Sequence, residues 1–279
     1  MSTIDAIYAQ YEKNKMATSG SANKVSQEER LKKYFTTVLD KGKKTGERRI
    51  RILPTTNGES PFVEARFHEM QVDGTWLKLY DPAQDGKRSP LNEIYEELMA
   101  TKKEEDKVLA RNYRSKKFYI VKVIDRDNEQ DGVKFWRFKH NTKSEGVFDK
   151  IFPIFKNKGD ISDVEKGRDL ILSLSLSKSG NGKEYTTINS IIPDDPSPLH
   201  TDEKIKKQWV EDELVWSDVY SIKGEDYLDL VARGEVPKWD ENLKKFVAFV
   251  PSSAETQSVV KPLIEDPQIN DEPDDDLPF

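Results

Sequence analysis

The chain of 279 residues contains no cysteine and three histidines. Without thiolates it has no disulfide, no cysteine nucleophile and no thiolate-held zinc or iron–sulfur centre. The histidines, His68, His140 and His200, lie far apart and lack metal-ligand spacing. No segment approaches about 18 consecutive apolar residues, and the first residues lack the basic and apolar regions of a signal peptide. We therefore expect a protein without a membrane span that works in the cytoplasm.

Charge is distributed unevenly along the chain, whose net charge is −6. The segment from Ala254 to Phe279 holds eight acidic residues and one lysine, so it carries −7 and the other residues together carry +1. Because the acidic residues are concentrated in a separable segment, the acidic overall composition does not exclude a nucleic-acid partner for the rest.

The composition divides the chain into three parts. Residues 1–24 are expected to form an N-terminal arm, a short helix with the apolar stripe Ile4, Ile7, Tyr8 and Tyr11 followed by a flexible linker. Residues 25–250 are expected to form the folded core, with a short helix near Glu28–Leu39. Residues 251–279, rich in proline, serine and acids, are typical of a disordered acidic tail.

The folded core is predicted to be mainly β with inserted helices. Alternating or buried apolar patterns predict the strands, namely 49–54, 62–70, 75–79, 117–124, 133–138, 170–176 and 184–192. Helical spacing is found at 91–103, at 147–155 with Pro153 as a break, and near 203–213 and 224–233. This pattern favours a Greek-key barrel of the oligonucleotide-binding (OB) type, with a helical subdomain inserted at about 80–110.

Basic and aromatic residues alternate in two consecutive strands, as binding of single-stranded nucleic acid requires. Lysine and arginine neutralise phosphates, and aromatic faces stack bases without sequence preference. The alternative interpretation is a strand with buried aromatics and solvated lysines, since only one face of a strand is expected to be core. The predicted DNA-binding residues are Lys43, Lys44, Arg49, Arg51, Arg111, Tyr113, Arg114, Lys116, Lys117, Tyr119, Lys134, Trp136, Arg137, Lys139 and Tyr185.

The chain ends in Asp274, Asp275, Asp276, Leu277, Pro278 and Phe279. An apolar end beside several carboxylates fits a basic, pocketed partner surface, so these six residues are the predicted partner-binding site. The same acids are expected to compete with nucleic acid for the basic groove.

Enzymatic signatures are lacking. The sequence has no phosphate-binding loop with Walker spacing and no Gly-x-Ser-x-Gly motif. The loop Asp125–Asp131 lacks the central glycine and closing glutamate of a calcium site, so a turn is the better interpretation. A metal-dependent nuclease, the enzymatic alternative, would need convergent carboxylates that the sequence does not place together.

Several segments in consistent order, within residues 47–231, resemble the single-stranded-DNA-binding protein of T-even-like bacteriophages. They are Ile50–Pro54, Pro61-Phe62, His68 through Trp76, Lys134 to Ile151, and Ile192–Asp195. The resemblance implies an OB barrel with an inserted zinc subdomain, a basic N-terminal arm and an acidic tail. The Asp-Asp-Asp-Leu-Pro-Phe end resembles instead the tip of bacterial single-stranded-DNA-binding proteins.

The resemblance implies a zinc held by one histidine and three cysteines, and this sequence departs from it. His68 stands where the histidine would be, while Tyr80 or Asp81, Ser89 and Asn92 stand near the cysteine positions. These residues cannot replace three thiolates, so no metal and no other cofactor is expected. Leu91, Ile94, Tyr95 and Leu98 are expected to form an apolar contact in its place.

Together these observations predict a non-enzymatic protein that coats single-stranded DNA in phage replication, recombination and repair, in the host cytoplasm. The tail is expected to recruit replication and recombination proteins, namely a polymerase, helicase loader, primase or recombinase. The N-terminal arm is expected to support self-association along DNA. An RNA-binding chaperone or translational regulator on the same fold remains the alternative, because base stacking does not exclude the 2′-hydroxyl.

Overall fold

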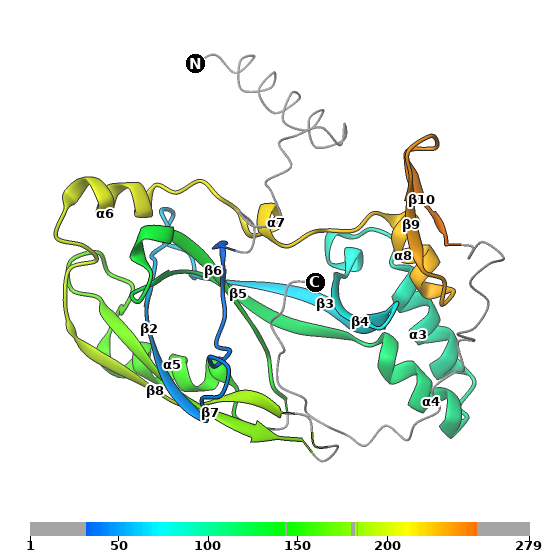
Figure 1. The fold of residues 1–279 in the computed structure, drawn as a ribbon, viewed down its shortest axis with the longest axis horizontal. Helices are drawn as coiled ribbons and strands as arrows, with labels where there is room; N and C mark the ends of the chain where they lie inside the picture. Colours follow the sequence, from blue (N-terminus) through cyan, green and yellow to red (C-terminus); the bar gives the residue numbers. More distant parts are fainter. Residues whose placement is uncertain (1–31, 143, 180–181, 183, 250–279) are drawn as a thin grey trace.

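The computed structural model describes residues 32–249 except 143, 180, 181 and 183, and these residues form a mainly β protein with several helices (Figure 1). The strands are β1 (Tyr34–Phe35), β2 (Thr45–Ile52), β3 (Phe62–Val72), β4 (Thr75–Tyr80), β5 (Ser115–Asp125), β6 (Val133–Lys139), β7 (Arg168–Lys178), β8 (Glu184–Pro196), β9 (Pro237–Asp240) and β10 (Lys245–Ala248). The helices are α3 (Pro90–Ala100), α4 (Glu104–Ala110), α5 (Val147–Lys158), α6 (Glu203–Val210), α7 (Trp216–Val219) and α8 (Glu225–Ala232), with 3₁₀ turns at Pro82–Asp85, Arg111–Tyr113 and Glu129–Asp131. No helix in this part of the chain is long and apolar enough to cross a membrane.

Eight strands form one mixed sheet in the order β1-β6-β5-β2-β7-β8, with β3 also paired to β5 and β4 paired to β3. All pairs are antiparallel except β1 with β6. Strands β3 and β2 pair with the same edge of β5. Strand β3 pairs with the first half of β5, and β2 pairs with its last residues. Within the described residues the sheet does not close into a barrel. Its edge strands are β1 and β8, at the ends of the main order, and β4, at the end of the branch through β3.

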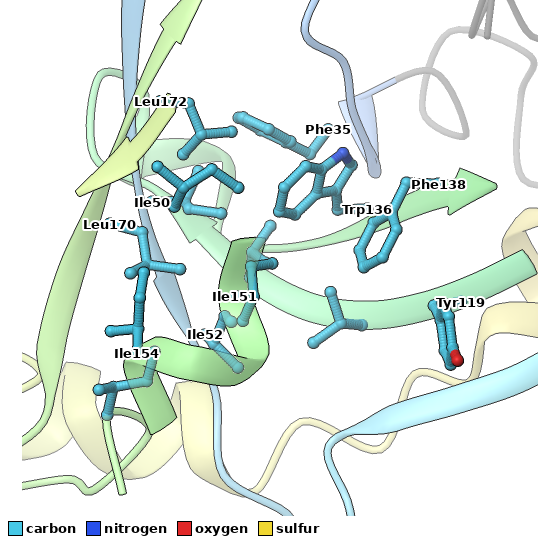
Figure 2. Close-up of a cluster of buried hydrophobic side chains, with 14 of the residues drawn as sticks. Phe35, Ile50, Ile52, Tyr119, Trp136, Phe138, Ile151, Ile154, Leu170 and Leu172 are labelled. Carbon is cyan, nitrogen blue, oxygen red and sulfur yellow. The ribbon is translucent and has the colours of Figure 1, made fainter. Parts of the chain in front are cut away.

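The main core lies on one face of this sheet (Figure 2). Alternation places Ile50 and Ile52 of β2, and Leu170, Leu172 and Leu174 of β7, on that face. Helix α5 covers it with Ile151 and Ile154, while Phe35, Trp136 and Phe138 fill the space toward β1. Tyr119 lies at the opposite end of the cluster from Leu170 and Leu172 in Figure 2.

The other face of β5 and β6 is also buried, which corrects the expectation that one face of these strands meets solvent. Phe118, Ile120 and Phe135 point to this second face. The segment around α7 packs on them through Val219 and Tyr220. A single strand pair therefore contributes to two hydrophobic clusters, and few of its side chains remain exposed.

A smaller unit is built on the β3–β4 hairpin, whose turn has Asp73 and Gly74 at positive φ. Met70 and Leu79 of the hairpin pack with Leu91 of α3 and with Leu228 and Val231 of α8. The two-stranded β9–β10 sheet lies beside α8 (Figure 1).

Most predicted elements are present, and the exceptions have physical causes. The predicted strands and the helices at 91–103, 203–213 and 224–233 are confirmed within a few residues. Pro153 does not break α5, which runs from Val147 to Lys158. Within the predicted 28–39 helix, Tyr34–Phe35 is instead a strand beside β6, because pairing and burial of Phe35 outweigh local propensity. Helices α4 and α7 and strands β9 and β10 were not predicted.

Trp136 offers a test of this core, because its side chain is 1% exposed and contacts Phe35 and Phe138. We expect Trp136→Ala to lower the free energy of unfolding by ~3–5 kcal/mol through lost burial and a cavity. Trp76→Ala, at an exposed position of β4, is the control and should change it by no more than ~0.5 kcal/mol. Urea denaturation followed by circular dichroism measures both. Equal small effects would show that Trp136 is not a core residue.

Candidate nucleic-acid interface

The face of β5 that forms the main core continues beyond it toward the start of the strand. Strand alternation places Lys117 on the same face as Tyr119. Arg66 of β3 pairs directly with Lys117, and the backbone N–H of His140 donates to the Lys117 carbonyl from the other side. The edge of the His140 ring faces the Tyr119 ring, with centroids 5.7 Å apart. Three basic residues therefore lie in a row, on β3, on β5 and directly after the end of β6, beside the end of the core.

Aromatic rings lead from this point of the core to the surface. Phe148 of α5 stacks on Tyr119, with ring centroids 4.3 Å apart and planes 13° from parallel. Phe152, one helical turn later, stacks on Phe148 with centroids 6.2 Å apart. Tyr119 is buried, whereas Phe152 is 56% exposed. The three rings thus form a series that ends in an exposed aromatic face.

Lys117 and Arg66 provide positive charge beside these rings. The Lys117 ammonium lies 5.0 Å from the Tyr119 ring centroid and forms an ion pair with Glu64 at 2.5 Å. The hydrogen bond to Glu64 raises the pKa of Lys117, so this side chain stays charged. Arg66 is exposed, and its guanidinium forms no ion pair with any residue of the described part. We call the set Arg66, Lys117, Tyr119, His140, Phe148 and Phe152 the β5–α5 surface.

Five predicted DNA-binding residues are buried. Tyr119 is one of them and begins the ring series, whereas burial of the other four corrects their assignment. Arg51 has no exposed surface and pairs with Asp169 at 2.9 Å. Trp136 is core. Lys134 forms buried ion pairs with Asp125 and Asp131.

The fourth residue, Arg137, is held between aromatic rings. Its guanidinium lies 4.9 Å from the Phe67 ring centroid and 4.3 Å from that of Tyr220. These contacts belong to the second hydrophobic cluster, on the face of β6 away from the β5–α5 surface. Arg51, Lys134 and Arg137 thus use their charge inside the fold rather than toward a ligand.

Lys116 and Lys139 point to the face opposite Lys117. Both form ion pairs with Glu69, at 2.6 and 3.5 Å. Burial alone would raise the pKa of Glu69, but the charges of Lys116 and Lys139 outweigh it and hold the pKa below its ordinary value. The structure therefore separates Lys116 from its neighbour Lys117.

The remaining predicted residues lie elsewhere. Lys43 pairs with Asp40 and Arg49 with Asp194 around β2, and Lys44 is exposed in the same region. Tyr185 is half-buried on β8, and Tyr113 is half-buried before β5. Arg111 and Arg114 are exposed at the entry to β5. The predicted partner-binding residues 274–279 and the N-terminal arm lie outside the described residues.

Four residues of the β5–α5 surface were absent from the predicted DNA-binding residues, namely Arg66, His140, Phe148 and Phe152. The i, i+4 spacing of two phenylalanines on the predicted 147–155 helix was a usable signal. Nothing in the sequence showed that this helix packs beside Tyr119.

The residues expected near a zinc position do converge, but as a polar cluster around Asp81. The side-chain amide of Asn92 donates to both Asp81 carboxylate oxygens at 3.0 Å. His68 Nε2 lies 3.6 Å from Asp81 Oδ1, and His68 Nδ1 lies 2.8 Å from the Tyr113 carbonyl. Burial opposes ionisation of Asp81, yet the polar groups of His68, Ser115, Ser89 and Asn92 hold its pKa well below the usual range.

This cluster does not have the chemistry of a structural zinc site. It offers one imidazole and oxygen donors, and its carboxylate already accepts from Asn92 and from the Ala83 backbone. Structural zinc sites use four sulfur or nitrogen ligands. Of the four residues expected to form an apolar contact here, Leu91 belongs to the cluster with Met70 and Leu79, whereas Ile94, Tyr95 and Leu98 are not part of it.

No protein-family model matches the chain, and no curated protein matches it. In the part of the chain that the structure describes, no three or more acidic, histidine or cysteine residues gather as a metal site.

We expect the chain to fold without zinc, because the Asp81 cluster replaces the metal contact with hydrogen bonds. Protein purified without a tag should contain less than stoichiometric zinc by elemental analysis. Its thermal midpoint should be the same with and without a chelator. Stoichiometric zinc, or a chelator-dependent midpoint, would contradict this.

Asp81 should also make the free energy of unfolding depend on pH in the acidic range. Its folded pKa lies below the unfolded value of about 3.9, so its contribution is present above that pH and is lost progressively as pH falls toward the folded pKa. We expect Asp81→Asn to lower the free energy of unfolding by ~1–3 kcal/mol at neutral pH.

The difference in the free energy of unfolding between wild type and Asp81→Asn should shrink below about pH 4. Urea denaturation from pH 7 to pH 2 measures it, with Glu96→Gln on the exposed face of α3 as control. A difference that stays constant over this range would show that the Asp81 charge does not stabilise the cluster.

Proposed function

We propose that this protein binds single-stranded nucleic acid on the β5–α5 surface and coats single-stranded DNA during replication, recombination and repair. The observation that carries the proposal is the stacked series from Tyr119 through Phe148 to exposed Phe152, placed beside Lys117 and Arg66. Single-strand binders combine such an aromatic platform with cations that follow the backbone.

The ring series suits base stacking because its inner end is fixed in the core. Tyr119 belongs to the core, and Phe148 stacks on it, so the Phe152 ring continues an ordered stack toward solvent. A base placed on Phe152 would extend this stack without hydrogen bonds to its edges. Such binding does not depend on base identity.

The two cations suit phosphate binding for different reasons. Arg66 forms no ion pair within the described residues, and Lys117 forms one that a phosphate can replace. Arg66 is exposed, and Lys117 is held by Glu64, whose side chain is 59% exposed. A phosphate arriving at Lys117 would replace an exposed ion pair that contributes little to stability. Glu64 in turn would discourage binding of anions that do not also stack.

In the proposal the framework is of the OB type. The mostly antiparallel sheet, with β5 shared between two neighbours and α5 packed on its core, supports this, while the described strands form an open sheet. Stacking does not distinguish deoxyribose from ribose, so an RNA-binding role on the same surface is the alternative. In the proposal the acidic end, Asp274 to Phe279, recruits replication and recombination proteins.

Neighbouring lysines on opposite faces of β5 provide the test. We expect Arg66→Ala with Lys117→Ala to reduce the magnitude of the log–log salt slope for poly(dT) binding by ~1.4, since each lost phosphate contact removes ~0.7. Phe152→Ala should weaken binding by ~1–3 kcal/mol with an unchanged thermal midpoint, and Phe152→Trp should retain binding.

Lys116→Ala is the matched control, because Lys116 is the neighbour of Lys117 and faces Glu69 instead. It should leave the slope unchanged. Fluorescence titrations at several salt concentrations measure all variants. If Lys116→Ala alters the slope and the Arg66→Ala, Lys117→Ala double variant does not, the nucleic acid crosses the opposite face of β5. The proposed surface is then wrong.

A further inference from the structure

The side of the sheet opposite the β5–α5 surface carries mostly basic side chains. The pairing of β3, β4, β5 and β6 places six charged side chains on this side, namely Lys78, Lys116, Lys122, Arg137, Lys139 and Glu69. All except Glu69 are basic, and one of these, Lys122, pairs with Asp212 of the segment before α7. The four strands therefore give this side of the sheet a positive charge.

An exposed tryptophan lies on the same side. Trp76 stands two residues before Lys78 on β4, so alternation directs both side chains to one side, and Trp76 is 55% exposed. We call Trp76, Lys78, Lys116 and Lys139 the lysine face. A positive surface with one large exposed ring fits a partner that combines negative charge with an apolar side chain.

The lysine face already stabilises one carboxylate. Burial alone would raise the pKa of Glu69, yet the charges of the three lysines hold that pKa below its ordinary value. Arg137 adds positive charge from beneath, because its buried guanidinium is enclosed by aromatic rings and its Nε has no hydrogen-bond partner among the described residues. These charges favour further carboxylates at the exposed part of the face.

The chain contains an acidic segment with apolar side chains that can reach this face. Residues 271–279 hold five acids and no basic residue, and they include Leu277, Pro278 and Phe279. The described part stops just after β10, which packs on α8. Helix α8 in turn packs on the other face of the β3–β4 hairpin from Lys78, through Leu79. Fully extended, residues 250–270 would span up to ~70 Å, more than is needed to pass around the edge strand β4.

We propose that residues 271–279 dock on the lysine face of their own chain, with carboxylates beside Lys78 and Lys139 and an apolar side chain on Trp76. This rests on the proposed function in one respect, the recruitment of partners by Asp274 to Phe279. A segment of the same chain is favoured over a separate partner, because tethering gives it an effective concentration in the millimolar range and weak contacts then suffice.

Docking on this face affects partner recruitment and not nucleic-acid binding. The lysine face and the β5–α5 surface lie on opposite sides of β5, where the neighbours Lys116 and Lys117 pair with different glutamates. A docked segment therefore withholds its own partner-binding residues and leaves the nucleic-acid surface open. This outcome differs from the competition for one groove that the charge distribution along the sequence predicts.

A labelled peptide of residues 271–279 tests the docking by fluorescence anisotropy. The receiving protein is the full chain in which the acids of its own segment are changed to amides, namely D271N, E272Q, D274N, D275N and D276N. This amide variant should bind the peptide more tightly than wild type does, because its own segment no longer occupies the face. Adding Lys78→Ala or Lys139→Ala should weaken peptide binding by about five-fold or more, the effect of an ion pair at the upper end for exposed pairs.

Lys117→Ala is the matched control, because Lys117 lies on the opposite side of β5 from the lysine face. It should leave peptide binding unchanged, and all variants should keep the wild-type thermal midpoint. Wild type and the amide variant should bind poly(dT) with the same affinity. If Lys117→Ala weakens peptide binding and Lys78→Ala does not, or if the amide variant binds poly(dT) much more tightly, the segment occupies the nucleic-acid surface and the inference is wrong.

Two further outcomes also overturn the inference. Weaker poly(dT) binding by the Lys78→Ala variant would assign the lysine face to nucleic acid. A wild-type dimer in sedimentation velocity that the amide variant lacks would show that the segment docks on a second copy. Failure of wild type to bind poly(dT) would instead overturn the proposed function, and the peptide titration would still decide the docking.

Discussion

Burial of both faces of β5 is the constraint on which the rest of the structure depends. The strand contributes Tyr119, Val121 and Val123 to one cluster, and Phe118 and Ile120 to the other. Its edges are paired with β6 on one side and with β2 and β3 on the other. Only the first residues of β5 extend past both clusters, so a ligand has access to this strand mainly there.

This constraint explains why the basic residues of the two strands do not act as one patch. Arg137 is enclosed by rings, Lys134 is paired to two aspartates, and Lys116 and Lys139 share Glu69. Separating a buried charge from its partners is costly, so these side chains cannot follow a phosphate backbone. Lys117 differs because it pairs with an exposed glutamate and lies beside a ring series that reaches solvent.

The sequence predicted the elements better than it predicted the interface. Alternation in Leu170–Leu176 and the Asp73-Gly74 turn are local signals, and both were sufficient. The segment around Tyr220 covers the second face of β5 and β6, and Tyr220 is 85 residues further along the chain than its partner Phe135. No local pattern marks such a cover, which is why Arg137 was assigned to the surface. Trp136 lies on the main-core face instead, where Phe35, also distant in sequence, packs on it. Asp81, Ser89 and Asn92 were identified as neighbours of His68, but their hydrogen bonds became visible only in the fold.

The central claim is that the protein stacks and holds single strands rather than reading duplexes or cleaving them. One titration series tests it: poly(dT), duplex DNA and poly(U) in the same buffer, with and without Mg²⁺, followed by anisotropy and by gel analysis of the nucleic acid. The account predicts tight binding of poly(dT), weak binding of duplex, and intact nucleic acid in Mg²⁺. Preferential duplex binding or cleavage would contradict it, and a clear preference for poly(U) would transfer the function to RNA.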